Sequence, residues 1–234
     1  MRVMAASSDG PDWVRETIVA TREDLRRYVA TAIGFTLRPR RFAERWIGGE
    51  LSAQHPLGVL ANALAISGAL GVLLGVHVDG LGAQLAQWAL PYLYYVGLGV
   101  LAHAMLRVTG PTRRLRASIA IALYTGGGPG LLGLLVMWAI GGTVMALHGA
   151  GGGLHGIGVL IVIVMLAPYV FVLTTLARGL GGAHGAGPVR TTLALLFALL
   201  VSAIVFGTVS NDFPVPHVAI DVAQWPPAFG VWVD

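Results

Sequence analysis

The chain has 234 residues, of which 56% are apolar and 11% charged, with a mean hydropathy of +0.75 and a net charge of +4. Soluble domains carry about 25% charged residues, so this composition excludes a soluble globular protein and predicts an all-α integral membrane protein. All 15 basic residues are arginine, which with abundant Ala, Gly, Leu and Val indicates a GC-rich bacterial genome, and the lack of cysteine excludes disulfides, thiolate nucleophiles and cysteine metal sites.

Residues 1–55 are predicted to form an amphipathic, basic cytoplasmic head. Residues 1–10 lack an apolar core, so we do not expect a cleaved signal peptide. Residues 11–35 repeat apolar side chains at helical spacing, as at Ile18 and Leu25, with arginines on another face. We expect this amphipathic helix to lie on anionic lipid, to dock a partner, or to pack on the protein's own cytoplasmic face.

An arginine cluster follows this helix, interleaved with Phe42 and Trp46. Its members are Arg38, Arg40, Arg41 and Arg45. Arginines just outside a membrane span attract acidic head groups, and the aromatic rings of Phe42 and Trp46 suit the membrane interface. The cluster and Trp46 are therefore predicted to anchor the chain to anionic lipid head groups, with a specific lipid or protein site as the alternative.

Residues 56–210 are predicted to form a domain of five transmembrane helices. The apolar segments cover residues 58–76, 88–106, 117–147, 156–177 and 191–210. None of them contains Asp, Glu or Arg, and all 15 arginines fall in the head or in the loops that follow the second and fourth segments. The positive-inside rule then puts the N-terminus in the cytoplasm and the C-terminus outside the bacterial inner membrane.

The third segment is the longest and contains a break of glycine and proline. Pro129 removes a backbone donor, and the backbone group that it frees needs a partner, so this part is expected to face protein rather than lipid. Gly126 and Gly130 form one G-x-x-x-G pair and Gly71 and Gly75 another, and such pairs allow close helix packing. We expect a kinked, tightly packed helix, and the alternative is a re-entrant loop that lines a cavity.

The segments carry no catalytic pattern. They contain no hydrolase, metalloprotease or phosphate-binding motif, so the prediction is a protein without enzymatic activity, metal or cofactor, and with no nucleic-acid partner. His103 lies near the cytoplasmic end of the second segment and is expected to hydrogen-bond a neighbour, the alternative being an axial ligand to haem or chlorophyll.

Residues 211–234 are predicted to form an extracytoplasmic tail rich in proline and tryptophan. Four prolines disfavour a regular helix there. Trp225, Phe229 and Trp232 are costly to leave in water, so we expect them to contact the bilayer or another subunit.

Four short motifs resemble those of the Yip domain family, the Ypt/Rab-interacting proteins and their bacterial relatives. They are Pro39 with Phe42, His103 with Gly110, Tyr124 with Pro129, and His184 with Gly185. The resemblance spans residues 36–210 and implies a five-span protein that acts in membrane organisation, trafficking or assembly. The acidic-aromatic signatures of Rab binding are absent from the head, so that activity is not expected.

The sequence thus predicts a non-enzymatic membrane scaffold or assembly subunit that packs against other membrane-protein subunits and anionic lipid. Two alternatives remain open at this point. One is an accessory subunit of a large respiratory or photosynthetic complex. The other is a channel or passive transporter, in which the glycine-proline break would line the path.

Overall fold

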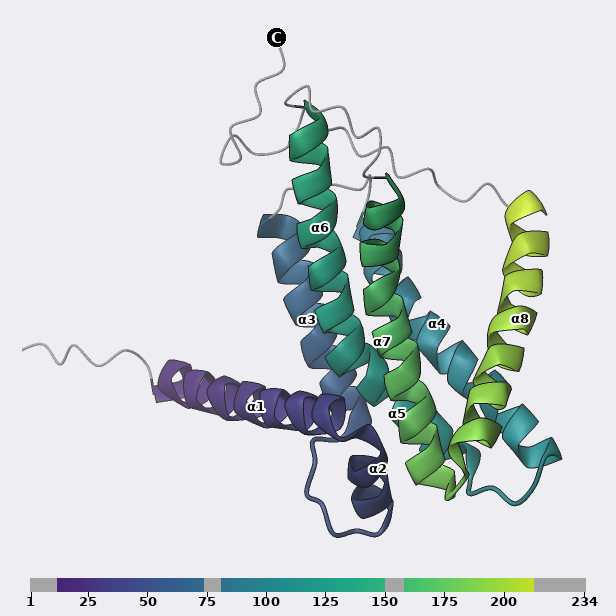
Figure 1. The fold of residues 1–234 in the computed structure, drawn as a ribbon. Helices are drawn as coiled ribbons and strands as arrows, with labels where there is room; N and C mark the ends of the chain where they lie inside the picture. The colour runs from purple at the N-terminus through teal and green to yellow at the C-terminus, as the bar shows by residue number, and fades with distance from the viewer. Residues whose placement is uncertain (1–11, 74–80, 150–157, 213–234) are drawn as a thin grey trace, which may run out of the picture.

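The computed structural model describes residues 12–73, 81–149 and 158–212, and these residues contain helices and no strand (Figure 1). The elements are α1 (Asp12–Leu37), α2 (Pro39–Ile47), α3 (Pro56–Leu73), α4 (Leu81–Val108), α5 (Leu115–Thr125), η1 (Gly126–Gly130), α6 (Leu131–Gly149), α7 (Gly158–His184) and α8 (Pro188–Asp212). Each of the five apolar segments of the sequence is helical over its described part. The fold is therefore all-helical, as predicted.

Four stretches of the described helices are long and apolar enough to cross a membrane. They are Ala89–Val108, Leu115–Ile140, Leu166–His184 and Pro188–Val205. The first apolar segment of the sequence corresponds to α3, whose apolar part is the shorter stretch Pro56–Gly71 within the described residues. The chain is therefore a membrane protein with four candidate spans and one shorter apolar helix.

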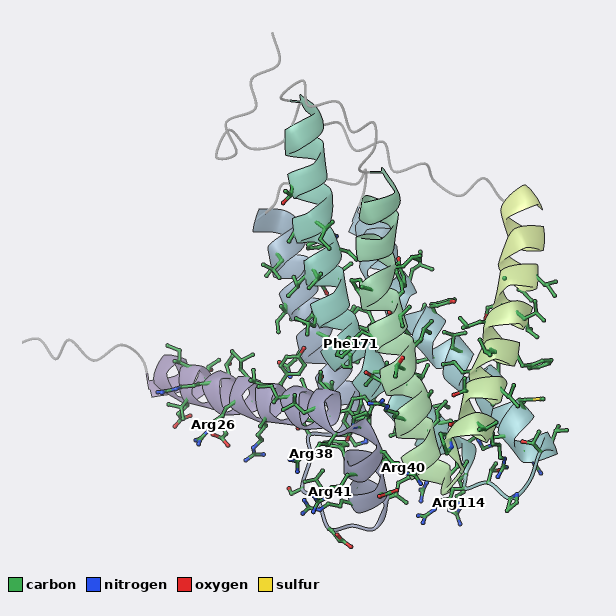
Figure 2. The ribbon with its side chains drawn as sticks, viewed as in Figure 1. Arg26, Arg38, Arg40, Arg41, Arg114 and Phe171 are labelled. Atoms are coloured by element: carbon green, nitrogen blue, oxygen red, sulfur yellow. The ribbon has the colours of Figure 1, made fainter. Side chains whose placement is uncertain are left out.

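The two N-terminal helices lie at one end of the bundle, which we call the arginine end. α1 extends sideways across the lower end of the other helices, and α2 packs on α7 (Figure 1). The arginine end also holds the α4–α5 and α7–α8 connections. Figure 2 labels five arginines on this side, Arg26 of α1, Arg40 and Arg41 of α2, and Arg38 and Arg114 just before α2 and α5.

α1 exposes both apolar and charged side chains. Ile18, Val29 and Ile33 are between 44% and 62% exposed, whereas Tyr28 and Phe35 turn inward and are buried in the core. An exposed row of this kind is costly in water and favourable at a membrane interface. The buried residues attach the helix to the bundle.

The glycine-proline break of the third segment is a π-helical turn, η1, between α5 and α6. Its last hydrogen bond runs from the N–H of Leu131 back to the carbonyl oxygen of Gly126, five residues earlier. The wider turn accommodates Pro129, which has no N–H to donate. All five residues of η1 are buried, so the chain passes through the break as one continuous helix.

Glycines in η1 let three other helices approach it. A Cβ on Gly127 would lie 2.5 Å from a side-chain carbon of Val59 in α3, and one on Gly128 would lie 3.4 Å from the backbone of Ala32 in α1. A Cβ on Gly126 would lie 3.0 Å from the ring of Tyr92 in α4. The break is therefore the point at which α1, α3 and α4 meet the third apolar segment.

α7 continues seven residues beyond the expected end of the fourth segment, to His184. Arg178 was expected in the loop after that segment but lies within the helix. Each of the four candidate spans includes one arginine near the arginine end of the bundle, and Arg178 lies deepest, six residues inside its span. The run Gly179–His184 stays helical because the surrounding side chains pack on it. Gly179, for example, is in contact with the ring of Phe35 and the side chain of Ile121. Tertiary packing here overrides the low helix propensity of glycine.

α2 and α7 make their closest approach at Gly182. A Cβ at this position would lie 2.9 Å from the carbonyl carbon of Arg40 and even nearer to its carbonyl oxygen. These are backbone atoms, which no rotamer change can move away. The packing of α2 on α7 therefore requires glycine at position 182.

Replacement of Gly182 by alanine should displace α2 and lower the free energy of unfolding by about 1–3 kcal/mol, the usual cost of overpacking. Gly97→Ala is the matched control because Gly97 is exposed on α4 with no atom within 4 Å of an added Cβ. That variant should be neutral or more stable by up to about 1 kcal/mol. Unfolding of both variants in the same detergent measures the difference, and equal stabilities would contradict the close approach.

Candidate functional site

An aromatic nest at the arginine end surrounds Tyr124. The rings of Phe35, Phe42 and Trp46 lie 5.8, 5.2 and 5.5 Å from the Tyr124 ring, centroid to centroid. The Tyr124 hydroxyl donates to the carbonyl oxygen of Gln54 at 2.8 Å, which holds the α2–α3 connection against the third apolar segment. Phe42 was expected at the membrane interface but is 7% exposed, because this nest takes it into the core.

A hydrogen bond joins α1 to the π-helical turn. In an α-helix the carbonyl oxygen of Gly127 would accept from the N–H of Leu131, but that N–H reaches back to Gly126 instead. The Tyr28 hydroxyl donates to the free carbonyl of Gly127 at 2.5 Å. Burial, with a smaller contribution from Tyr92, raises the pKa of the Tyr28 phenol to about 12. The hydroxyl therefore keeps its proton and remains a donor at neutral pH.

Three buried polar side chains form a directed hydrogen-bond chain between α4, α5 and α7. The backbone N–H of Arg113 donates to Nδ1 of His184 at 3.1 Å, so Nδ1 carries no proton. We therefore assign the proton of His184 to Nε2, which donates to Ser118 Oγ at 2.7 Å. The hydroxyl of Ser118 then donates to Nδ1 of His103 at 3.0 Å. His103 thus hydrogen-bonds a neighbour, as predicted.

An arginine clasp closes the α4–α5 connection onto α8. The guanidinium of Arg190 donates to Thr109 Oγ1 at 3.0 Å, to the carbonyl oxygen of Pro111 at 3.2 Å and to that of Leu106. Gly110 has φ +152°, and a Cβ there would lie 3.1 Å from the guanidinium, so only glycine lets Arg190 lie flat on the turn. The clasp ties the start of α8 to the end of α4.

The His103–Ser118–His184 hydrogen bonds join α4, α5 and α7 to one another. Ser118 is completely buried, so no substrate reaches its hydroxyl. The outer nitrogen of His184 accepts from a backbone N–H, whereas an orienting partner in a catalytic triad is usually a carboxylate. Within residues 12–73, 81–149 and 158–212, no three His, Asp or Glu side chains are placed to hold a metal ion.

The residues singled out from the sequence lie in three settings. Exposed at the arginine end are Arg38, Arg40, Arg41 and Arg45. Buried in the bundle are Gly71, Gly126, Pro129 and Gly130, while Trp46 is partly buried against Tyr124. Gly75, Trp225, Phe229 and Trp232 lie outside the described residues. The positions of the described residues are compatible with the predicted roles without testing them.

Sequence reasoning missed the partners that complete these hydrogen bonds. It assigned no role to Tyr28, Ser118 or Arg190. Three residues of the short motifs, Tyr124, His103 and His184, each take part in one of these hydrogen bonds. The pairing itself joins residues 66 to 99 positions apart, which no local pattern reveals.

Comparison with known proteins adds no relative. No protein-family model matches the chain, and neither a curated protein nor a solved structure matches it significantly. The functional argument therefore depends on the geometry of this chain alone.

Ser118→Ala should lower the free energy of unfolding by about 1–3 kcal/mol, because it leaves the Nε2–H of His184 without an acceptor and Nδ1 of His103 without a donor in a buried site. Ser52→Ala, at an exposed position, should change it by less than about 0.5 kcal/mol. Denaturant unfolding of the two variants measures the costs. A Ser118→Ala protein as stable as the wild type would show that the hydrogen-bond chain does not fasten the three helices.

Proposed function

We propose that this chain is a non-enzymatic scaffold of the bacterial inner membrane, an assembly subunit of Yip type. It crosses the membrane five times, with the arginine end in the cytoplasm and the C-terminal tail outside. The single observation that carries the proposal is the attachment of α1 and α2 to the spans through buried contacts. That attachment holds an arginine-rich surface in a fixed position next to the inner leaflet.

Five crossings are supported by the length of α3 and by the distribution of charge. The 18 residues of α3 rise about 27 Å, close to the thickness of about 30 Å of a hydrocarbon core. The labelled arginines of α1, α2 and the start of α5 all lie at one end of the bundle. This is the asymmetry that orients membrane proteins with their basic side in the cytoplasm.

A scaffold role is supported by the use of polar groups in the bundle. The buried hydroxyl and imidazole groups of Tyr28, Ser118 and His184 are committed to bonds that hold the helices together. The outer face of α8, by contrast, presents a row of exposed apolar side chains, including Leu193, Phe197 and Ile204, which suits lipid or a partner helix. In the channel alternative η1 would line a path, whereas all of its residues are buried.

The side of the membrane on which each surface lies can be tested with single introduced cysteines, because the chain has no cysteine of its own. Ser52→Cys, at an exposed site between α2 and α3, should react with a membrane-impermeant maleimide only in inside-out vesicles. His217→Cys in the tail should react only in intact cells whose outer membrane is permeabilised. Reaction of both from the same side would exclude an odd number of crossings and overturn the proposed orientation.

The scaffold role predicts that other membrane proteins accompany the full chain when native membranes are extracted in copolymer discs without detergent. A tagged, unrelated polytopic protein extracted in parallel identifies chance neighbours. Stoichiometric partners found only with this chain would support the scaffold. Redox or pigment proteins among them would favour the accessory-subunit alternative, and a chain that comes out alone and conducts solute in liposomes would replace the scaffold with a channel.

A further inference from the structure

A groove runs between α7 and α8, with two arginines at its mouth. Its volume is about 400 Å³, within the range of about 300–1,000 Å³ typical of ligand sites. Leu173 and Ala177 of α7 and Leu195 and Leu199 of α8 form apolar walls, and Arg40 and Arg178 complete the lining. The groove is thus apolar along its length and strongly basic at one end.

The length of the groove matches one leaflet of a bilayer. It follows α7 over residues 170–181, which is about 16 Å at the rise of an α-helix. Half of a hydrocarbon core is about 15 Å. The arginine-rich mouth faces the end of the bundle where α7 turns into α8, so the apolar part extends from the cytoplasmic surface toward the bilayer midplane.

Arg178 is placed to serve this mouth. It lies six residues before the end of α7, inside the candidate span Leu166–His184, and so deeper than the arginine of any other candidate span. A charged side chain within a span usually marks a functional site. Among the described residues the structure gives Arg178 no ion pair and no hydrogen-bond partner. Its side chain is exposed.

Arg40 reaches the same groove from the head. The close approach at Gly182 sets the backbone of Arg40 against α7 and so fixes its position. Its Nε is paired with Glu44 Oε1 at 3.0 Å, and both side chains of this ion pair are about half exposed. Two arginines from different elements, Arg40 of α2 and Arg178 of α7, thus line the same groove.

We propose that the α7–α8 groove binds one anionic phospholipid of the cytoplasmic leaflet. Arg178 and Arg40 bind the phosphate of its head group, and one acyl chain lies along the apolar walls. The groove matches such a lipid along its length. Its arginines lie at the membrane surface, at the level of a phosphate group, and its apolar walls lie below them, at the level of an acyl chain. The site shares Arg40 with the exposed cluster of head arginines and adds to it Arg178 and the apolar walls of α7 and α8. The inference rests on the proposed orientation of the arginine end.

A second groove, on the other side of α8, does not share these properties. It is lined by Met105 of α4 and by Leu193 and Arg190 of α8. The guanidinium of Arg190 is committed to the clasp on the α4–α5 connection. It therefore has no comparable pair of guanidinium groups available for a head group.

The test is native mass spectrometry of the purified full chain titrated with dioleoylphosphatidylglycerol, with dioleoylphosphatidylcholine as the zwitterionic comparison. Arg178→Gln and Arg40→Gln should each weaken binding of the first bound phosphatidylglycerol by about fivefold. The matched control is Arg114→Gln, which removes an exposed charge away from the groove. This control should bind phosphatidylglycerol as the wild type does.

A third variant, Thr174→Trp, fills the groove without a change of charge and should also reduce binding. It keeps the test decisive if an arginine variant does not fold. Equal losses in the groove variants and the control, equal binding of the two lipids, or binding of glycerol 3-phosphate as tight as that of the lipid would each overturn the proposal. The measurement uses the isolated chain, so absence of protein partners leaves it unaffected, and loss of lipid binding leaves the scaffold proposal standing.

Discussion

Inside a bilayer each polar group must find its partner within the protein, because the hydrocarbon offers none. This constraint explains why the head and the spans are a single unit. The π-helical turn frees the carbonyl of Gly127, and the hydroxyl that satisfies it comes from Tyr28 of α1. In the same way, the hydroxyl of Tyr124 in α5 donates to the backbone carbonyl oxygen of Gln54, which follows α2. The head therefore completes the hydrogen bonding of the membrane domain and is not an appendage to it.

The helices were predictable because their signal is local. Uncharged stretches near 20 residues long produce helices wherever the chain enters lipid, and each expected apolar segment became one over its described part. The ends were less predictable. Gly179–His184 looked like loop by composition, but packing against Phe35 and Ile121 continues α7 through it and draws Arg178 into the helix. Phe42 was likewise expected at the interface, but it is buried in the core, where its ring packs against that of Tyr124.

Of the buried hydrogen bonds between helices, the sequence predicted that His103 would bond a neighbour and that the glycine-proline break would need partners. It did not identify the partners. Ser118 and His184 lie on different helices, and their meeting depends on how α5 packs between α4 and α7. The arrangement of helices is a non-local property, so a hydroxyl such as that of Ser118 looks the same in sequence whether it faces lipid or joins two imidazoles.

The packing is very uneven along the bundle. In an 18-residue window of Leu115–Ile140, 72% of the residues are buried, against 28% in Pro188–Val205 of α8. α8 is fixed at its start by the clasp of Arg190 and leans away from α7 toward its far end (Figure 1). A helix held at one end takes up changes in hydrocarbon thickness by tilting. Thinner or thicker bilayers should thus tilt α8 about the end that the clasp holds, while the densely packed helix of Leu115–Ile140 keeps its orientation.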